Sequence, residues 1–449
     1  MGVSMLLRFS VGNVLSFNEK VSFSMIPSLQ KSNNSNLISL GSVNVLRFGV
    51  VYGANASGKS NFIKAFHLGL RIISKGISNR VVNDYCKISE SNKSNVSIFE
   101  YTFFSEGSFF SYGFSCILSQ KRIVDEWLYT INPANDTEKV LFLRENENVN
   151  GKSVFQIQLT TEDLSRVNTY LLDMKEKHHL LLLGQLKDKK FDSNSNLKII
   201  ESVVSWLKNI DVTYPDEPIN NLEVLHEDNC ERISRILSSF DTGISKIYFE
   251  KITLDELQHR IRQTELIQEI REMFIERFEK HPGKLGMLLR GKDEFYKIEG
   301  TSIEELEVSV LRLNHHNSET VFEFSDESDG TRRMFDLLDI LLTDRDNVVF
   351  VIDEIERSLH PVLLYKFFEM MKNEFVGKNI QIIVTTHETH ILDQSLLRRD
   401  EVWFVEKEET GASKLYSLDV FKERIDKNLS KNYLNGNYGG IPLFDKMER

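Results

Sequence analysis

The sequence is poor in cysteine and contains no long apolar run. Its three cysteines, Cys86, Cys116 and Cys230, lie far apart and form no Cys-x-x-Cys pair. This arrangement argues against a zinc site and suits a reducing compartment. No apolar run approaches the roughly 18 residues that a transmembrane helix needs, and residues 1–9 lack the apolar core of a signal peptide. The sequence therefore predicts a soluble cytoplasmic protein that does not bind membranes.

An excess of positive charge is also absent. The chain has 55 Lys and Arg against 66 Asp and Glu, which gives a net charge of -11. Binding to nucleic acid generally requires a basic surface, so the composition weakens a general role of this kind. A local basic groove, and hence DNA binding, stays open. The length of 449 residues is too great for one simple domain and predicts two or three structural units.

Apolar patterns near the N-terminus indicate strands and one helix. Residues 6–25 alternate between apolar and polar side chains, as a strand pair with one solvated face does. The apolar run 45–52 predicts a strand that ends at a Gly-rich turn, and residues 61–73 after it have helical spacing. Two further strand patterns, at 96–104 and 109–118, are joined by a short turn.

The pattern changes in the middle of the chain. Helical spacing dominates from about residue 160 to 282, and strands and helices alternate from about 308 to 405. Such alternation is typical of a covered, largely parallel sheet. We therefore predict the α/β fold class, with two halves, residues 1–130 and 301–449, separated by a mostly helical insertion at 131–300.

Residues 53–60 read Gly-Ala-Asn-Ala-Ser-Gly-Lys-Ser, a complete P-loop motif between a strand and a helix. In this context successive backbone amides and the helix N-terminus face phosphate oxygens. We expect Lys59 to neutralise the β- and γ-phosphates of ATP and the Ser60 hydroxyl to ligate Mg²⁺. The expected ATP-binding residues are Gly53, Ala54, Asn55, Ala56, Ser57, Gly58, Lys59, Ser60 and Asn61.

A second motif follows an uninterrupted apolar run at residues 348–352, which ends in Asp353 and Glu354. Such a run is typical of a strand buried on both faces, and open α/β sheets bind ligands at the C-terminal ends of their strands. Together with the P-loop, this pattern indicates a Walker B motif. We expect Asp353 to hold Mg²⁺, directly or through water, and Glu354 to act as the catalytic general base on the attacking water.

Ser328 and Gly330 indicate another anion-binding helix start, before a helix predicted at 334–342. One nucleotide does not need two such termini from one chain, so we expect these residues to bind ATP held by a second subunit. Here the chain resembles the ABC ATPase superfamily in its SMC and RecF-like branch, whose signature has the form LSxGxx. The resemblance implies a homodimer or higher homo-oligomer with composite sites. It also assigns residues 358–361 to the D-loop and makes His387 the catalytic switch histidine.

A narrower resemblance covers both ends of the chain. Several stretches resemble bacterial ATPases related to the OLD family: ESDGTRR, VIDEIERSLHP, IIVTTHETHILD, RRDEVWFVEK and NYGGIP. These ATPases include the ATPase components of anti-phage systems such as RloA, AbiLi and AriA of PARIS. Two departures stand out. No clear Q-loop is present, Gln120 being only a weak candidate. The about 60 residues after His387 are too few for the TOPRIM nuclease domain of OLD enzymes, so we do not expect this chain alone to be a nuclease.

The resemblance implies an ATP-hydrolysing molecular switch of an anti-phage defence system, which senses infection and controls a separate effector such as a nuclease. The insertion is the expected docking surface, because ATPase chemistry does not require it. Two alternatives stay open: a RecF- or SMC-like ATPase in DNA repair or maintenance, and an ATP-binding scaffold without turnover. Glu354 argues against the scaffold, since binding alone has no need of a general base. The acidic charge and the lack of a long paired coiled coil favour the switch over the repair enzyme.

Overall fold

The computed structural model describes residues 3–30, 33–133, 137–145, 153–155, 160–192, 194–215, 229–261, 264–280, 283, 285–290, 294–303, 305–421 and 428–441. The chain divides into two compact units. Unit 1 comprises Met1–Glu217, Arg345–Glu356 and Phe367–Arg449, and unit 2 comprises Pro218–Asp344 and Arg357–Lys366. This division differs from the three segments predicted from the sequence, because residues 131–217 lie in unit 1 and Ser328 lies in unit 2.

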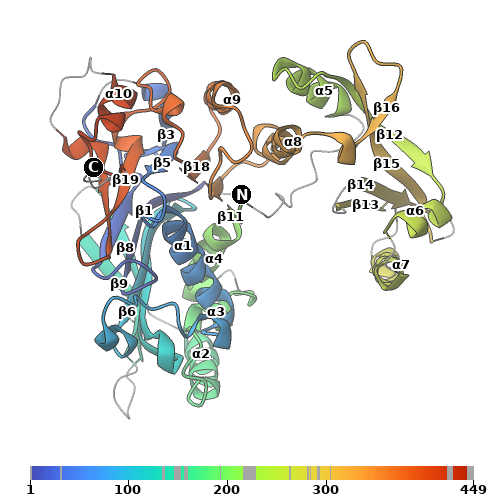
Figure 1. Ribbon diagram of the computed structural model, residues 1–449. Helices are drawn as coiled ribbons and strands as arrows, with labels where there is room; N and C mark the ends of the chain where they lie inside the picture. Colours follow the sequence, from blue (N-terminus) through green and yellow to red (C-terminus); the bar gives the residue numbers. More distant parts are fainter. Residues whose placement is uncertain are drawn as a thin grey trace. The chain divides into compact units, whose positions relative to one another are not determined.

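The first sheet of unit 1 joins seven of the described strands, all antiparallel, in the order β10-β9-β8-β7-β6-β1-β2. Four of these strands, β1, β6, β8 and β9, are labelled in Figure 1. The strands are β1 (Ser4–Gly12), β2 (Val21–Ser24), β6 (Ser97–Ser105), β7 (Ser108–Ile117), β8 (Arg122–Asn132), β9 (Thr137–Glu145) and β10 (Ser153–Phe155). The strands predicted within 6–25 and at 96–104 and 109–118 are confirmed. Glu106 and Gly107 form the tight turn between β6 and β7, with φ of 47° and 87°, as a type I′ hairpin requires.

The second sheet of unit 1 is the predicted, largely parallel one. Its described strands follow the order β11-β17-β18-β5-β19-β20, and the pairing is parallel except between β19 and β20. The strands are β5 (Phe48–Tyr52), β11 (Ile210–Thr213), β17 (Val348–Ile352), β18 (Ile380–Thr385), β19 (Val402–Lys407) and β20 (Ser413–Ser417). Every residue of β5, β17 and β18 is buried, which explains the uninterrupted apolar run of β17. Helix α9 (Pro361–Glu374) connects β17 to β18.

The run at 45–52 is not one strand, as predicted, but two. Strand β4 (Asn44–Leu46) pairs with β3 (Leu37–Ser39), and β5 begins after Arg47. The Arg47 guanidinium is buried and donates to the Lys378 and Ile380 carbonyl oxygens at 3.0 and 3.2 Å. A buried cation needs acceptors of this kind.

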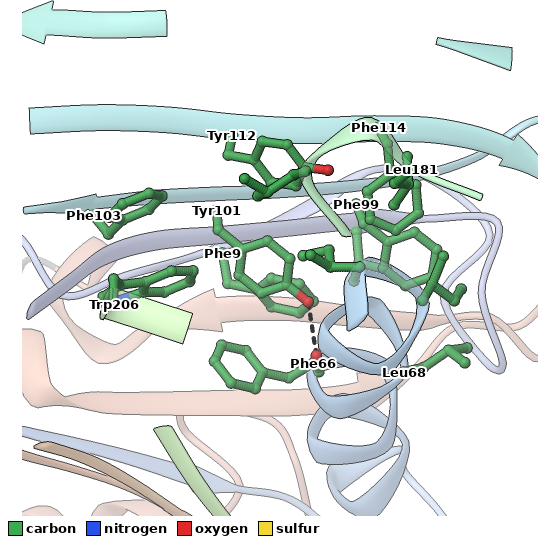
Figure 2. Packing of buried hydrophobic residues seen from close by; sticks show 14 of the residues in the cluster. Phe9, Phe66, Leu68, Phe99, Tyr101, Phe103, Tyr112, Phe114, Leu181 and Trp206 are labelled. Atoms are coloured by element: carbon green, nitrogen blue, oxygen red, sulfur yellow. Dashed lines mark hydrogen bonds between the residues drawn. The ribbon is translucent and has the colours of Figure 1, made fainter. Parts of the chain in front are cut away.

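Aromatic side chains fill the core of unit 1 (Figure 2). Phe9 of β1 lies 5.0 Å, between ring centroids, from both Phe66 of helix α1 (Lys59–Lys75) and Tyr101 of β6. The buried Tyr101 hydroxyl donates to the Phe66 carbonyl at 2.7 Å, which ties α1 to the first sheet. Trp206 stacks on Phe103 at 4.1 Å with ring planes 7° apart. The helix that follows the P-loop is thus fixed by packing and by one buried hydrogen bond.

Part of the segment predicted as an insertion belongs to this core. Helix α4 (Ile199–Lys208) carries Trp206, and β11 pairs with the Walker B strand β17. Between α2 (Thr161–Asp173) and α4, helix α3 (Leu182–Leu186) begins against the fully buried Glu126 carboxylate, which accepts from the amides of Leu182 and Leu183 at 2.7 and 3.0 Å. The prediction that residues 131–300 form a separate insertion is therefore wrong for the α2–β11 region, which belongs to unit 1.

Unit 2 is built on a sheet in the order β12-β15-β14-β13, with β16 also paired to β15. Its described strands are β12 (Ile244–Ile252), β13 (Leu285–Arg290), β14 (Phe295–Gly300), β15 (Glu307–His315) and β16 (Val321–Glu323), and its helices include α5 (Cys230–Ser239), α6 (Leu254–Ile261), α7 (Thr264–Lys280) and α8 (Asp329–Leu341). Strand β12 lies in the stretch from about 160 to 282 in which the sequence predicted mostly helix. Its pairing with β15 shifts register between Ile244 and Lys246, and such a bulge disrupts the alternation that marks a strand.

Helices α6 and α7 begin and pack as their patterns indicate. The spacing of Thr253 and Glu256 predicts a capping box, and both reciprocal bonds are present: the Thr253 amide donates to Glu256 Oε2 at 2.8 Å, and the Glu256 amide donates to Thr253 Oγ1 at 3.2 Å. Leu257, Ile270 and Phe274 are buried in one cluster with side chains of β14 and β15. These helices therefore cover one face of the unit 2 sheet.

The structure bears on two of the expectations about the chain's environment, those that concern its cysteines and membrane-spanning helices. Cys86, Cys116 and Cys230 are buried, and none of these three described cysteines forms a disulfide. Within the ranges that the structure describes, no helix has both the length and the apolar character needed to cross a membrane.

Candidate nucleotide-binding site

The P-loop connects β5 to α1, as the motif predicts. Ala56 and Gly58 adopt positive φ angles of 61° and 117°, and Asn55 and Ala56 form the exposed tip of the loop. A Cβ on Gly53 would lie 2.4 Å from the Val405 carbonyl oxygen and 2.5 Å from Ser57 Oγ. Only glycine fits at this first position, because strand β19 passes directly beside it.

Lys59 lies folded onto its own loop. Its ammonium donates to the carbonyl oxygens of Gly53 at 2.7 Å and Ala54 at 3.1 Å. Burial lowers the pKa of Lys59, and the nearby carboxylates of Glu356, Glu354 and Asp353 oppose that effect. A desolvated cation with weak neutral acceptors and acidic neighbours is suited to exchange those acceptors for phosphate oxygens.

The Walker B residues follow β17, beside the parallel strand β18. Asp353 is buried, and its Oδ1 accepts from the Thr385 hydroxyl at 2.5 Å. The same hydroxyl oxygen accepts from the Glu354 amide at 2.8 Å. Glu354 adopts a φ of 48°, a region that non-glycine residues rarely occupy. Thr385 thus fixes the turn that presents both carboxylates at the end of the strand.

His387 follows β18 at the same sheet edge and is paired with Glu356. The distance from His387 Nδ1 to Glu356 Oε1 is 2.6 Å, and the His387 amide donates to the same oxygen at 2.9 Å. The hydrogen bond to Glu356 raises the pKa of His387. Burial acts to raise the pKa of Glu356, but the hydrogen bonds from the His387 side chain and amide lower it overall. The pair therefore favours a protonated ring beside the P-loop.

The signature residues lie in unit 2. The Ser328 side chain caps α8, accepting from the Thr331 amide at 3.1 Å. The helix begins at Asp329, five residues earlier than predicted, so Gly330 lies in its first turn. A Cβ on Gly330 would lie 2.8 Å from the carbonyl oxygen of Ser358, the first residue of the expected D-loop. The segments predicted as signature and D-loop are thus in contact within unit 2.

Unit 1 brings together the P-loop, Asp353, Glu354 and His387. Gln120, the weak Q-loop candidate, ends a short 3₁₀ turn (Leu118–Gln120) between β7 and β8. The sequence reasoning missed Thr385 and Glu356. A signal for both was present, since Thr385 ends the strand preceding His387 and Glu356 stands two residues after Glu354.

The donor set suits magnesium. Hydroxyl and carboxylate oxygens such as those of Ser60 and Asp353 are hard ligands, and Mg²⁺ in nucleotide sites is usually held by one or two carboxylates plus phosphate and water. Among the described residues, no group of three or more His, Cys, Asp or Glu side chains comes close enough to hold a metal ion.

The fold and the site define a P-loop ATPase of the α/β class. A family model described as "AAA domain, putative AbiEii toxin, Type IV TA system" matches residues 48–393, and the chain belongs to this family. The match begins at the first residue of β5 and extends past His387, so it includes the P-loop, Ser328 and Gly330, and Asp353 and Glu354.

Among solved structures, the chain is similar to heads of SMC proteins. An Smc head bound to the C-winged helix domain of ScpA is 14% identical with a TM-score of 0.37, the alignment covering 92% of this chain and 97% of that one. The SMC head domain from Thermotoga maritima is 12% identical (TM-score 0.35; 92% and 98% covered). A Pyrococcus furiosus Smc head with an extended coiled coil, bound to the C-terminal domain of ScpA, is 13% identical (TM-score 0.37; 92% and 96% covered). No curated protein matches the sequence.

Proposed function

We propose that the protein is an ABC-type, ATP-hydrolysing molecular switch that acts as a homodimer or higher homo-oligomer with shared ATP sites. One observation carries this proposal: the P-loop, Asp353, Glu354 and His387 converge in unit 1 and supply each group that hydrolysis requires. The capped helix start at Ser328 and Gly330 in unit 2 is a second anion-binding terminus. In a dimer this terminus can act on the partner subunit, because it can close over the γ-phosphate of the ATP bound to the opposite chain.

Each residue has a role that its surroundings support. Lys59 and the loop amides bind the β- and γ-phosphates, and Ser60 and Asp353 hold Mg²⁺. Glu354 positions and deprotonates the attacking water. Glu356 is a positioning residue, because it occupies Nδ1 of His387 and leaves the other ring nitrogen for the γ-phosphate.

The biological setting is part of the proposal. The family description includes the words "putative AbiEii toxin, Type IV TA system", and three buried cysteines that form no disulfide suit the reducing cytoplasm. We place the protein in a bacterial anti-phage defence system, where it senses infection and controls a separate effector, most simply a nuclease. ATP-dependent rearrangement can hold or release an effector only if the effector binds the two states with different affinity.

Subunit mixing tests the shared site. Lys59→Ala disables the P-loop, and Ser328→Arg blocks the signature, so each parent dimer has two damaged sites. A mixed dimer gathers both lesions in one site and leaves the other intact. We expect ATPase activity to reappear on mixing, up to about half of the wild-type rate per mixed dimer if sites act independently. Ser318→Arg, the same substitution at an exposed position of the β15–β16 connection, is the matched control and should keep activity by itself.

The outcomes separate the candidate functions. No recovery in verified mixed dimers would contradict independent composite sites. Stimulation of ATPase activity by DNA ends, together with salt-dependent DNA binding, would instead favour the RecF- or SMC-like repair enzyme.

A further inference from the structure

Strands β19 and β20, in the C-terminal part of unit 1, lie beside the P-loop. Strand β19 runs parallel to β5, with Phe404 paired to Tyr52 immediately before the loop. Strand β20 returns beside β19, and its first residue, Ser413, is 4% exposed. The distance along the sequence from this serine to the P-loop is more than 350 residues, yet its hydroxyl donates to the Ser57 carbonyl oxygen at 2.6 Å.

This hydrogen bond acts on the peptide that joins Ser57 to Gly58. In a trans peptide the carbonyl and the following N–H point in opposite directions. With the Ser57 oxygen held by Ser413, the Gly58 N–H is directed to the other side of the loop. In a P-loop, backbone amides of this stretch bind phosphate. Ser413 therefore determines where one phosphate-binding donor points without touching the nucleotide.

The surroundings of Gly58 restrain the same peptide sterically. A Cβ on Gly58 would lie 2.4 Å from Ser413 Oγ and 2.8 Å from Ser16 Oγ, so the backbone is seated against these two serines. The Ser413 amide donates to the Ser16 carbonyl at 2.7 Å, which fixes Ser413 itself. At the other end of the loop, a Cβ on the buried Gly440 would lie 3.8 Å from the Gly53 Cα.

We infer that Ser413 is a positioning residue for nucleotide binding, which pre-orients the Ser57–Gly58 peptide of the P-loop. This inference rests on the proposed function, because it requires that nucleotide phosphates bind at this loop. A donor that is already oriented loses little further conformational entropy when the ligand binds, and the affinity for the ligand is therefore higher.

Titration of the purified full-length chain with MgADP by calorimetry tests the assignment. Ser413→Ala should weaken ADP binding roughly three- to ten-fold, the equivalent of one ordinary hydrogen bond. The matched control is Tyr416→Phe, which removes another hydroxyl of β20 that donates to a backbone carbonyl, that of Tyr438 at 2.8 Å. It should lower the unfolding midpoint by a similar amount and leave the ADP affinity unchanged. Ser413→Cys keeps the size of the side chain but donates more weakly, so its affinity should be intermediate.

Each result has one meaning. Wild-type ADP affinity in Ser413→Ala, or an equal loss in Tyr416→Phe, would overturn the role of Ser413. If Ser413→Ala does not fold, Ser413→Cys decides by the same comparison. Failure of the folded wild-type chain to bind ADP would instead overturn the proposed function.

Discussion

Replacing Gly69 by alanine should destabilise unit 1, although the same change normally stabilises a helix. Gly69 lies inside α1, where alanine is favoured over glycine by about 1 kcal/mol on propensity alone. The added Cβ, however, would lie 2.1 Å from Tyr101 Oη and 2.9 Å from Phe99 Cδ1, both inside the packed core (Figure 2). The close approach of α1 to the first sheet therefore requires a residue without a side chain.

The magnitude follows from three terms. Overpacking a core costs about 1–3 kcal/mol, and displacing the Tyr101 hydroxyl from the Phe66 carbonyl costs about 1 kcal/mol more. Subtracting the propensity gain of about 1 kcal/mol leaves a net loss of roughly 1–3 kcal/mol. Because α1 begins with Lys59 and Ser60, a displaced helix should also weaken ADP binding.

Urea unfolding followed by tryptophan fluorescence measures the effect on unit 1, which contains all three tryptophans, Trp127, Trp206 and Trp403. Tyr101→Phe removes the atom nearest to the added Cβ. The double variant should therefore be more stable than the sum of the two single losses predicts, by about 0.5–3 kcal/mol. A Gly69→Ala protein at least as stable as wild type, or strictly additive losses, would refute this account of the core.

Four further predictions concern the site and its partners. Lys59→Ala should fold but lose ATP binding, and wild-type affinity by calorimetry would contradict the P-loop assignment. Glu354→Gln should bind ATP while turnover falls by about 10²- to 10⁴-fold; turnover within a few-fold of wild type in a phosphate-release assay would exclude it as the base. The His387–Glu356 pair should be fully formed at pH values between the lowered pKa of Glu356 and the raised pKa of His387, because the first group must be ionised and the second protonated. It should be lost as pH rises through the His387 pKa, and NMR titration should show that pKa falling in Glu356→Gln; an unchanged value would argue against the pair. Finally, the purified chain should cleave neither DNA nor RNA; metal-dependent cleavage that is absent from a site mutant would overturn the need for a separate effector.

The sequence by itself determined the local motifs. The P-loop is one continuous stretch of sequence, and so is the Asp353–Glu354 pair. Each motif directly adjoins a strand or helix with a clear pattern, so a short segment of the chain is enough to recognise it. Strand–helix alternation in the second half also predicted the parallel sheet correctly. Those signals are local because hydrogen bonding within a helix and burial of a strand act on neighbouring residues.

Only the tertiary structure decided which distant residues support those motifs. Thr385 fixes Asp353 because β18 lies beside β17, and β11 completes that sheet edge from a stretch that resembled an insertion. Ser413 reaches Ser57 through the order of β5, β19 and β20. Strand order results from how buried faces pack together, and the pattern along a single strand shows that it is buried without showing which strand lies next to it.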